Sequence, residues 1–117
     1  QAFSALLEDL DERGLLESTL VAWTGQFGRT PRINGNAGRD HWGRVYNTVL
    51  AGGGVKPGQI YGATDKVGGE PVDNPRHVSD YFATIYHALG FEPTTQVIDR
   101  SNRPHFVIQG TPIREVF

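Results

Sequence analysis

Apolar side chains recur at helical spacing in two segments of the chain, and a glycine follows each segment. The two stripes consist of Phe3, Leu6, Leu7 and Leu10, and of Phe82, Ile85, Tyr86 and Leu89. This spacing predicts an amphipathic helix over residues 2–13 and another over residues 80–89. We expect Gly14 and Gly90 to end these helices, and Ser79 to cap the start of the second.

Three other apolar runs have the short length that is typical of β-strands. They cover residues 19–24, 45–51 and 106–108. The first run is apolar without clean alternation, which favours a strand that is covered on both faces. Three glycines at residues 52–54 end the second run, and residues 59–62 are expected to form either a short strand or a turn. The order of these elements fits part of a layered α/β protein.

The segments between these elements are rich in glycine, proline and asparagine. Residues 25–43 and 63–76 are therefore predicted to be loops. A loop as long as the first is usually functional or mobile inside a compact domain. Its side chains are the first candidates for chemistry.

Length and composition bound the class of protein. With 117 residues, the chain is expected to form a single α/β unit over residues 1–117. The formal net charge of -2 argues against a nucleic-acid partner. No apolar run approaches the roughly 20 residues of a membrane span. The chain has no cysteine, which excludes a disulfide framework and a thiolate metal site. None of these properties indicates an oligomeric state.

Two polar side chains follow the first predicted strand in the run TGQFGRTP at residues 24–31. Side chains at the carboxyl end of a strand lie where open α/β sheets bind their ligands. Gln26 can donate and accept hydrogen bonds, and Arg29 offers a planar fork for phosphate, sulfate or carboxylate. Both are candidate substrate-binding residues. In the alternative interpretation, Gly25 and Gly28 shape a tight turn, and Arg29 pairs with a nearby acid.

An acid and a histidine are adjacent in the run GRDHW at residues 38–42. Neutral imidazole is a common metal ligand, so His41 is a candidate ligand and Asp40 a co-ligand or a residue that orients it. A metal site needs three or more ligands, and no other histidine stands at a recognisable ligand spacing from His41. We expect Trp42 to be a packing anchor, because tryptophan is highly buried on average. We expect His87 to be a solvated or packed residue on its helix.

Several of these motifs together resemble one bacterial family. They are LLESTLV at residues 15–21, QFGRTP at 26–31, GRDHW at 38–42, LAGGG at 50–54 and DYFATIYHALG at 80–90. Over essentially its whole length, the chain is similar to the sulfatase-like "domain of unknown function 1501" family. Members of that family are several times longer, and this chain starts without methionine. We therefore expect it to be the C-terminal segment of a longer sulfatase-like domain.

The resemblance implies membership of the alkaline phosphatase superfamily, and with it the C-terminal part of an alkaline phosphatase-like α/β/α sandwich. Enzymes of that superfamily hydrolyse phosphate or sulfate esters at a site with one or two metals, for which zinc or calcium is expected here. Their C-terminal half typically supplies an Asp-His pair, whose place is taken by Gln26-Phe27, and a later ligand, which falls at His41. The nucleophile is expected outside this segment. Export to the periplasm or the cell exterior is implied in the same way.

Two functions follow from this resemblance. In the first, the protein is a metal-dependent hydrolase that acts on a small anionic ester. Its residues would be the metal ligand His41, its helper Asp40, the anion clamp Arg29 and the polar contact Gln26. In the second, the fold persists without hydrolysis as an exported binding or assembly module, which the missing Asp-His pair favours.

Overall fold

A computed structural model describes residues 1–117. The chain divides into two compact units. Unit 1 consists of residues 1–20, 51–57 and 76–117, and unit 2 of residues 21–50 and 58–75. Helices occur together with four sheets of two strands each. This combination confirms the predicted mixed α/β class.

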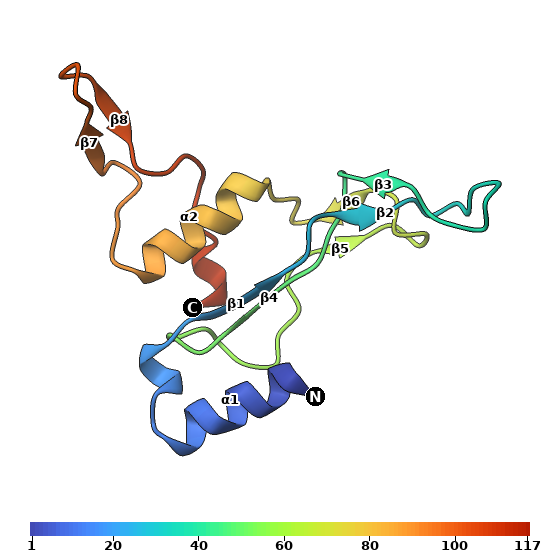
Figure 1. Ribbon diagram of the computed structural model, residues 1–117, viewed down its shortest axis with the longest axis horizontal. Helices are drawn as coiled ribbons and strands as arrows, with labels where there is room; N and C mark the ends of the chain where they lie inside the picture. The colour runs from blue at the N-terminus through green and yellow to red at the C-terminus, as the bar shows by residue number, and fades with distance from the viewer. The chain divides into compact units, whose positions relative to one another are not determined.

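Unit 1 holds both α-helices and the last β-hairpin of the chain (Figure 1). Its elements are α1 (Ala2–Glu12), η1 (Leu16–Ser18), α2 (Val78–Ala88), β7 (Gln96–Ile98), β8 (Pro104–Phe106) and η2 (Arg114–Val116). The two α-helices confirm the two predicted helices. Neither of them has the length and apolar content that a bilayer crossing requires.

Both α-helices end in the same glycine motif. After each helix, the N–H of the glycine and the N–H of the following residue donate to carbonyls of the last turn. This arrangement requires a positive φ at the glycine, and φ is 66° at Gly14 and 87° at Gly90. A residue with a Cβ atom would be strained there. The predicted role of both glycines is therefore confirmed.

The start of α2 differs from the prediction, because His77 and not Ser79 is the N-cap. The His77 ring accepts a hydrogen bond from the Ser79 N–H at 3.3 Å, and the Asp80 carboxylate accepts one from the His77 N–H at 3.0 Å. The two bonds form a reciprocal capping box in which an imidazole replaces the usual hydroxyl. Statistical preferences for caps favour small polar side chains, and so they pointed to the serine.

The core of unit 1 lies between α2 and the C-terminal residues. The buried side chains include Tyr81, Ala83, Thr84, Ile113 and Val116. Thr84 is fully buried, and its hydroxyl donates to the Asp80 carbonyl at 2.6 Å. The same hydroxyl accepts a hydrogen bond from the Ile113 N–H at 2.9 Å. One threonine therefore joins the helix to the segment that leads into η2.

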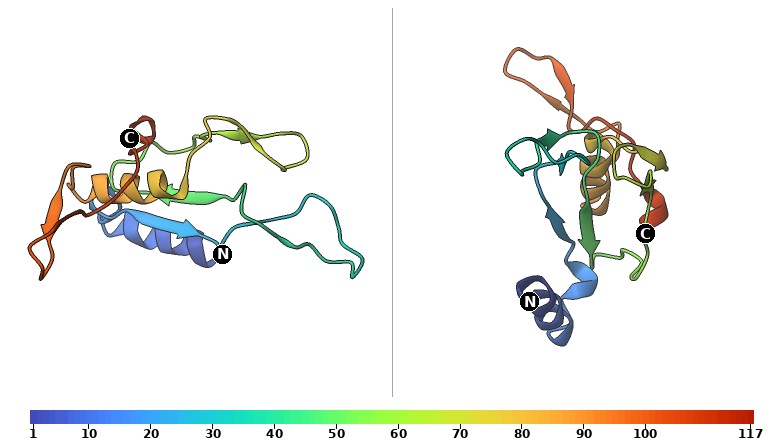
Figure 2. Two further views of the ribbon diagram at one scale, coloured as in Figure 1. Left: turned by 90° about the horizontal axis from the view of Figure 1, so that it is seen from above. Right: turned by 90° about the vertical axis from the view of Figure 1, so that its right-hand side faces the viewer.

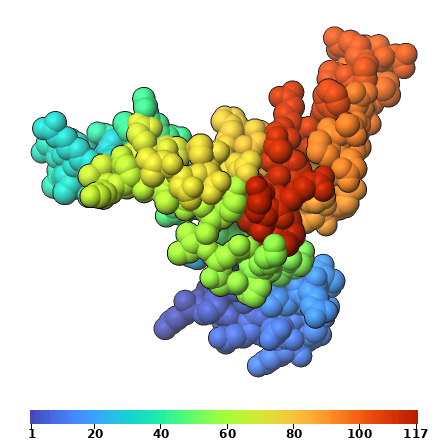
Figure 3. Space-filling model, turned by 180° about the vertical axis from the view of Figure 1, so that it is seen from behind, coloured from blue at the N-terminus to red at the C-terminus, as the bar shows by residue number.

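β7 and β8 form an antiparallel hairpin that protrudes from the rest of unit 1 (Figures 2 and 3). Asp99 organises its turn, since the carboxylate accepts hydrogen bonds from the N–H groups of Ser101 at 2.8 Å and Arg103 at 2.9 Å. The hydrogen bond from the Arg103 N–H has the largest effect on the pKa of Asp99 and holds it below its ordinary value, and the hydrogen bond with the His105 ring acts in the same direction. The strand predicted at residues 106–108 is shifted to β8, and β7 was not predicted.

Unit 2 is built from short strands. They are β1 (Val21–Thr24), β2 (Gly28–Arg29), β3 (His41–Trp42), β4 (Thr48–Ala51), β5 (Ala63–Thr64) and β6 (Pro71–Asp73). β1 pairs with β4, β2 with β3, and β5 with β6. The β2–β3 and β5–β6 pairs lie inside the two segments that were predicted to be loops.

The first predicted strand is correctly located but differs in its surroundings. β1 pairs only with β4, and three of its four residues are exposed. Trp23 is 57% exposed. The prediction of a strand covered on both faces is therefore not met, because most of its side chains are exposed.

Candidate anion-binding site

The pairing of β2 with β3 places a guanidinium and an imidazole on one face of unit 2. Arg29 is the direct cross-strand partner of His41, and Gly28 is the partner of Trp42. Side chains of directly opposed residues lie on the same face of an antiparallel pair, with Cβ atoms about 5 Å apart. The long loop therefore brings together two candidate residues that are 12 positions apart in the sequence.

Neither of these two side chains is engaged elsewhere by a polar contact. The Arg29 guanidinium makes no hydrogen bond or ion pair within residues 1–117, so the ion pair of the alternative interpretation is not present. The His41 ring makes an edge-to-face contact with the Phe27 ring, with centroids 4.7 Å apart. Both residues are exposed. Their N–H groups are available to an anion from solvent.

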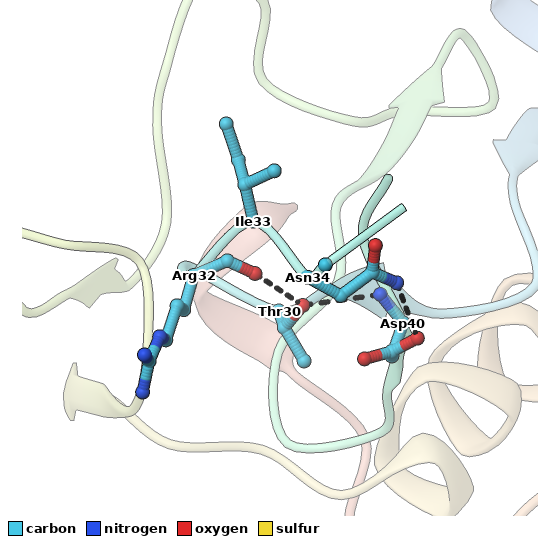
Figure 4. Close-up of a pocket in the computed structure, with 6 residues that line it drawn as sticks. Thr30, Arg32, Ile33, Asn34 and Asp40 are labelled. Atoms are coloured by element: carbon cyan, nitrogen blue, oxygen red, sulfur yellow. Dashed lines mark hydrogen bonds between the residues drawn. The ribbon is translucent and has the colours of Figure 1, made fainter. Parts of the chain in front are cut away.

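Asp40 is the sequence neighbour of His41, and Figure 4 shows it beside Thr30 and Asn34. Its carboxylate accepts a hydrogen bond from the Asn34 side chain at 2.9 Å, and its N–H donates to the Thr30 hydroxyl at 3.1 Å. These residues line a hollow of about 350 Å³, and the Arg32 side chain extends away from Asp40. The Asp40 carboxylate is thus held by a side chain of its own loop.

The residues present do not by themselves fit a metal ion. Within residues 1–117, no three side chains of histidine, cysteine, aspartate or glutamate come together. Asp40 is bound to Asn34, and His41 packs against Phe27. A zinc or calcium ion needs more ligands than this pair provides in one place. The assignment of Asp40 and His41 as metal ligands stays a prediction.

A second hollow, of about 380 Å³, lies beside Arg29. Its lining consists of Gly25, Phe27, Gly28, Arg29, Val45, Tyr46, Asn47, Thr64 and Gly68. Gln26 is exposed and lines neither hollow. Tyr46 and Asn47 are lining residues that the sequence did not predict. No local motif marks them, because the hollow is formed by three separate segments.

Trp42 lies on the opposite face of the β2–β3 pair and is half-buried. Its indole N–H donates to the Gly69 carbonyl at 2.7 Å. The Arg44 guanidinium lies 5.4 Å from the centre of its ring and forms an ion pair with Glu70. Trp42 therefore fastens the β2–β3 pair to the β5–β6 hairpin, which confirms its predicted role as a packing anchor.

The comparison with protein families matches this chain to a known family. The family described as a protein of unknown function (DUF1501) matches residues 1–117. The chain belongs to the DUF1501 family. No curated protein and no solved structure matches it. This match confirms the DUF1501 family that the sequence motifs indicated, whereas the kinship with sulfatases and the alkaline phosphatase superfamily stays a prediction.

The three other histidines of this DUF1501 chain have separate structural roles in unit 1. His77 caps α2, and His105 Nε2 lies 2.9 Å from an Asp99 carboxylate oxygen. His87 is half-buried, and its ring lies edge-to-face with Phe117 at 6.0 Å. The last contact agrees with the expectation of a packed histidine on the helix.

Proposed function

We propose that this chain contributes an anion-binding face, made of Arg29 and His41, to a hydrolase of phosphate or sulfate esters. We also propose that the DUF1501 family is related to sulfatase-like enzymes of the alkaline phosphatase superfamily. The chain would then form the C-terminal part of an α/β/α sandwich. The observation that carries it is the direct cross-strand pairing of Arg29 with His41. A small anionic ester is the class of ligand that this pair fits.

The chemistry of the two side chains is complementary. The planar fork of Arg29 can donate two parallel N–H groups to two oxygens of one phosphate or sulfate. At a cross-strand spacing of about 5 Å, an N–H of His41 can reach a third oxygen or the bridging oxygen of the same ester. The Phe27 ring limits rotation of the imidazole by packing against it. An imidazole in this position can also deliver a proton to a departing alcohol.

A divalent metal, zinc or calcium, could bind here only if ligands besides His41 and Asp40 completed its coordination. His41 would supply one donor, and Asp40 would have to leave Asn34 to supply another. None of the anion contacts described above depends on such an ion. Gln26 would be a further polar contact to the ester, although it is exposed and lines neither hollow.

A non-catalytic exported module that binds or assembles is the second candidate. It is favoured by Phe27, which occupies a position where the resemblance implies a metal-ligating side chain and instead packs on His41. Such a module would use the same contacts from Arg29 and His41 to hold an anionic ester without cleaving it. Both candidate functions therefore predict that the anionic ester binds to Arg29 and His41, but only the hydrolase predicts that the ester is cleaved.

The full-length protein provides the test. Hydrolysis of 4-nitrophenyl phosphate and 4-nitrophenyl sulfate is measured with and without a chelator, and binding of inorganic sulfate is measured by calorimetry. Arg29→Gln should weaken sulfate binding by about ten- to a hundredfold, because a charge-assisted pair of hydrogen bonds is lost. Arg32→Gln is the matched control, since Arg32 is also an exposed arginine of the same segment but lines the other hollow.

Each outcome separates the candidates. Turnover that Arg29→Gln lowers and Arg32→Gln preserves supports the hydrolase. Sulfate binding that depends on Arg29 without any turnover supports the binding module. Equal behaviour of the two variants rejects the anion-binding face altogether. Metal analysis of His41→Ala tests the ligand assignment separately, since an unchanged metal content would remove His41 from any metal site.

A further inference from the structure

The hollow beside Arg29 has two walls that come from different parts of unit 2. Phe27 and Arg29 belong to one wall, and Thr64 and Gly68 of the β5–β6 hairpin belong to the other. The β2–β3 pair and the hairpin belong to separate two-stranded sheets, so no strand pairing joins these two walls. Contacts other than strand pairing therefore hold the two walls relative to each other.

Trp42 makes the side-chain contact that links the two walls. Its N–H donates to the carbonyl of Gly69, the residue that follows Gly68 in the hollow. Gly69 is buried, and its own N–H donates to the Asp65 carboxylate at 2.7 Å. Gly69 is thus held by two hydrogen bonds. Its carbonyl accepts one from Trp42, and its N–H donates one to Asp65 of its own hairpin.

A second interaction reinforces this link. Arg44 lies over the Trp42 ring and pairs with Glu70, the neighbour of Gly69. The cation therefore contacts an aromatic ring of the β2–β3 pair and a carboxylate of the β5–β6 hairpin. The hydrogen bond from Trp42 to Gly69 and the ion pair between Arg44 and Glu70 both hold the β5–β6 hairpin close to strands β2 and β3.

We propose that Trp42 sets the width of the hollow beside Arg29, and so decides which ester alcohols fit there. This inference rests on the proposed function, in which Arg29 binds the anionic end of the ester. Trp42 does not line the hollow, and so it is a positioning residue for substrate specificity. A hollow of about 380 Å³ is near the lower end of the usual range for ligand sites, which fits an alcohol with a single ring.

The test compares three probes that carry the same anion and differ in the attached group. They are inorganic sulfate, methyl sulfate and 4-nitrophenyl sulfate, and their binding to the full chain is measured by calorimetry. Trp42→Phe keeps an aromatic ring below Arg44 but removes the N–H that reaches Gly69. It should weaken binding of 4-nitrophenyl sulfate by about tenfold and leave inorganic sulfate and methyl sulfate unchanged within about twofold. Trp23→Phe is the matched control, because Trp23 belongs to the same unit and does not line the hollow.

Hydrogen exchange gives a readout that is independent of any ligand. In Trp42→Phe, the amides of Val67 and Gly69, which donate to Asp65, should exchange faster than in the native chain. An unchanged ratio of affinities for 4-nitrophenyl sulfate and methyl sulfate overturns the inference. If Arg29→Gln leaves sulfate binding intact, the proposed function fails instead, and the exchange rates still decide whether Trp42 holds the hairpin.

A second variant covers the case in which Trp42→Phe unfolds unit 2, which would be seen as a loss of inorganic sulfate binding. Glu70→Gln removes the ion pair that holds Arg44 and leaves the indole N–H in place. It should shift the same affinity ratio in the same direction by a smaller factor of about two to three. A ratio equal to that of the native chain in this variant would then count against the inference.

Discussion

Replacement of Gly28 by alanine is the sharpest test of how unit 2 positions Arg29. A Cβ atom at Gly28 would lie 2.2 Å from the Val45 carbonyl oxygen and 3.3 Å from the Trp42 carbonyl oxygen. The first of these oxygens already accepts the Gly28 N–H at 2.8 Å. Alanine therefore cannot enter without moving β2 by roughly 1 Å, since non-bonded heavy atoms do not approach so closely.

The cost of this substitution has two contributions. Overpacking in a position without space costs about 1–3 kcal/mol. Loss of the hydrogen bond to Val45 adds about 0.5–1.5 kcal/mol. The free energy of unfolding should fall by about 2–4 kcal/mol, a large part of the total stability of a small domain. Sulfate binding should weaken as well, because Arg29 is the next residue of the displaced strand.

Urea unfolding followed by tryptophan fluorescence measures the effect, because both tryptophans belong to unit 2. The midpoint for Gly28→Ala should fall by about 1–2 M. Gly25→Ala is the matched control in the same turn, since a Cβ atom there meets nothing within 4 Å. Its stability should stay within about 1 kcal/mol of the native chain. If the two variants unfold at the same urea concentration, the close contact with Val45 is not what holds β2.

Two further predictions concern unit 1, where far-UV circular dichroism follows unfolding. Thr84→Val should lower the free energy of unfolding by about 1–3 kcal/mol, because the buried Ile113 N–H loses its acceptor, whereas Thr84→Ser should cost only about 1 kcal/mol. Equal losses in these variants would show that the hydroxyl is unimportant. The N–H of Thr111 holds the pKa of Asp80 below its ordinary value of 3.8, and the N–H of His77 acts in the same direction. A lowered pKa stabilises the fold above the ordinary value and ceases to do so as the pH falls through the folded-state value. Asp80→Asn should therefore reduce the loss of stability between about pH 6 and about pH 2.5, and an unchanged loss would contradict this reasoning.

Local interactions explain which parts of unit 1 were predictable. The ends of α1 and α2 were predicted because the glycine motif involves only residues of the last turn and the next few positions. His77 was missed as a cap although its bonds are equally local, because an imidazole is a rare acceptor at that position. The hairpin of β7 and β8 was missed in part, because its pairing joins residues that lack a strong alternating pattern.

In unit 2, the residue types of the site could be read directly from the sequence, namely a guanidinium at residue 29 and an imidazole at residue 41 in a glycine-rich segment. Their placement on one face could not be read from it, because cross-strand register depends on how the intervening loop closes. The hydrogen bond between Asn34 and Asp40 likewise depends on the fold of that loop. The hollow beside Arg29 is formed by residues from three segments, and no periodicity in one segment carries information about the others. Side-chain identity is local, whereas the distance between two side chains is set by every contact that folds the chain between them.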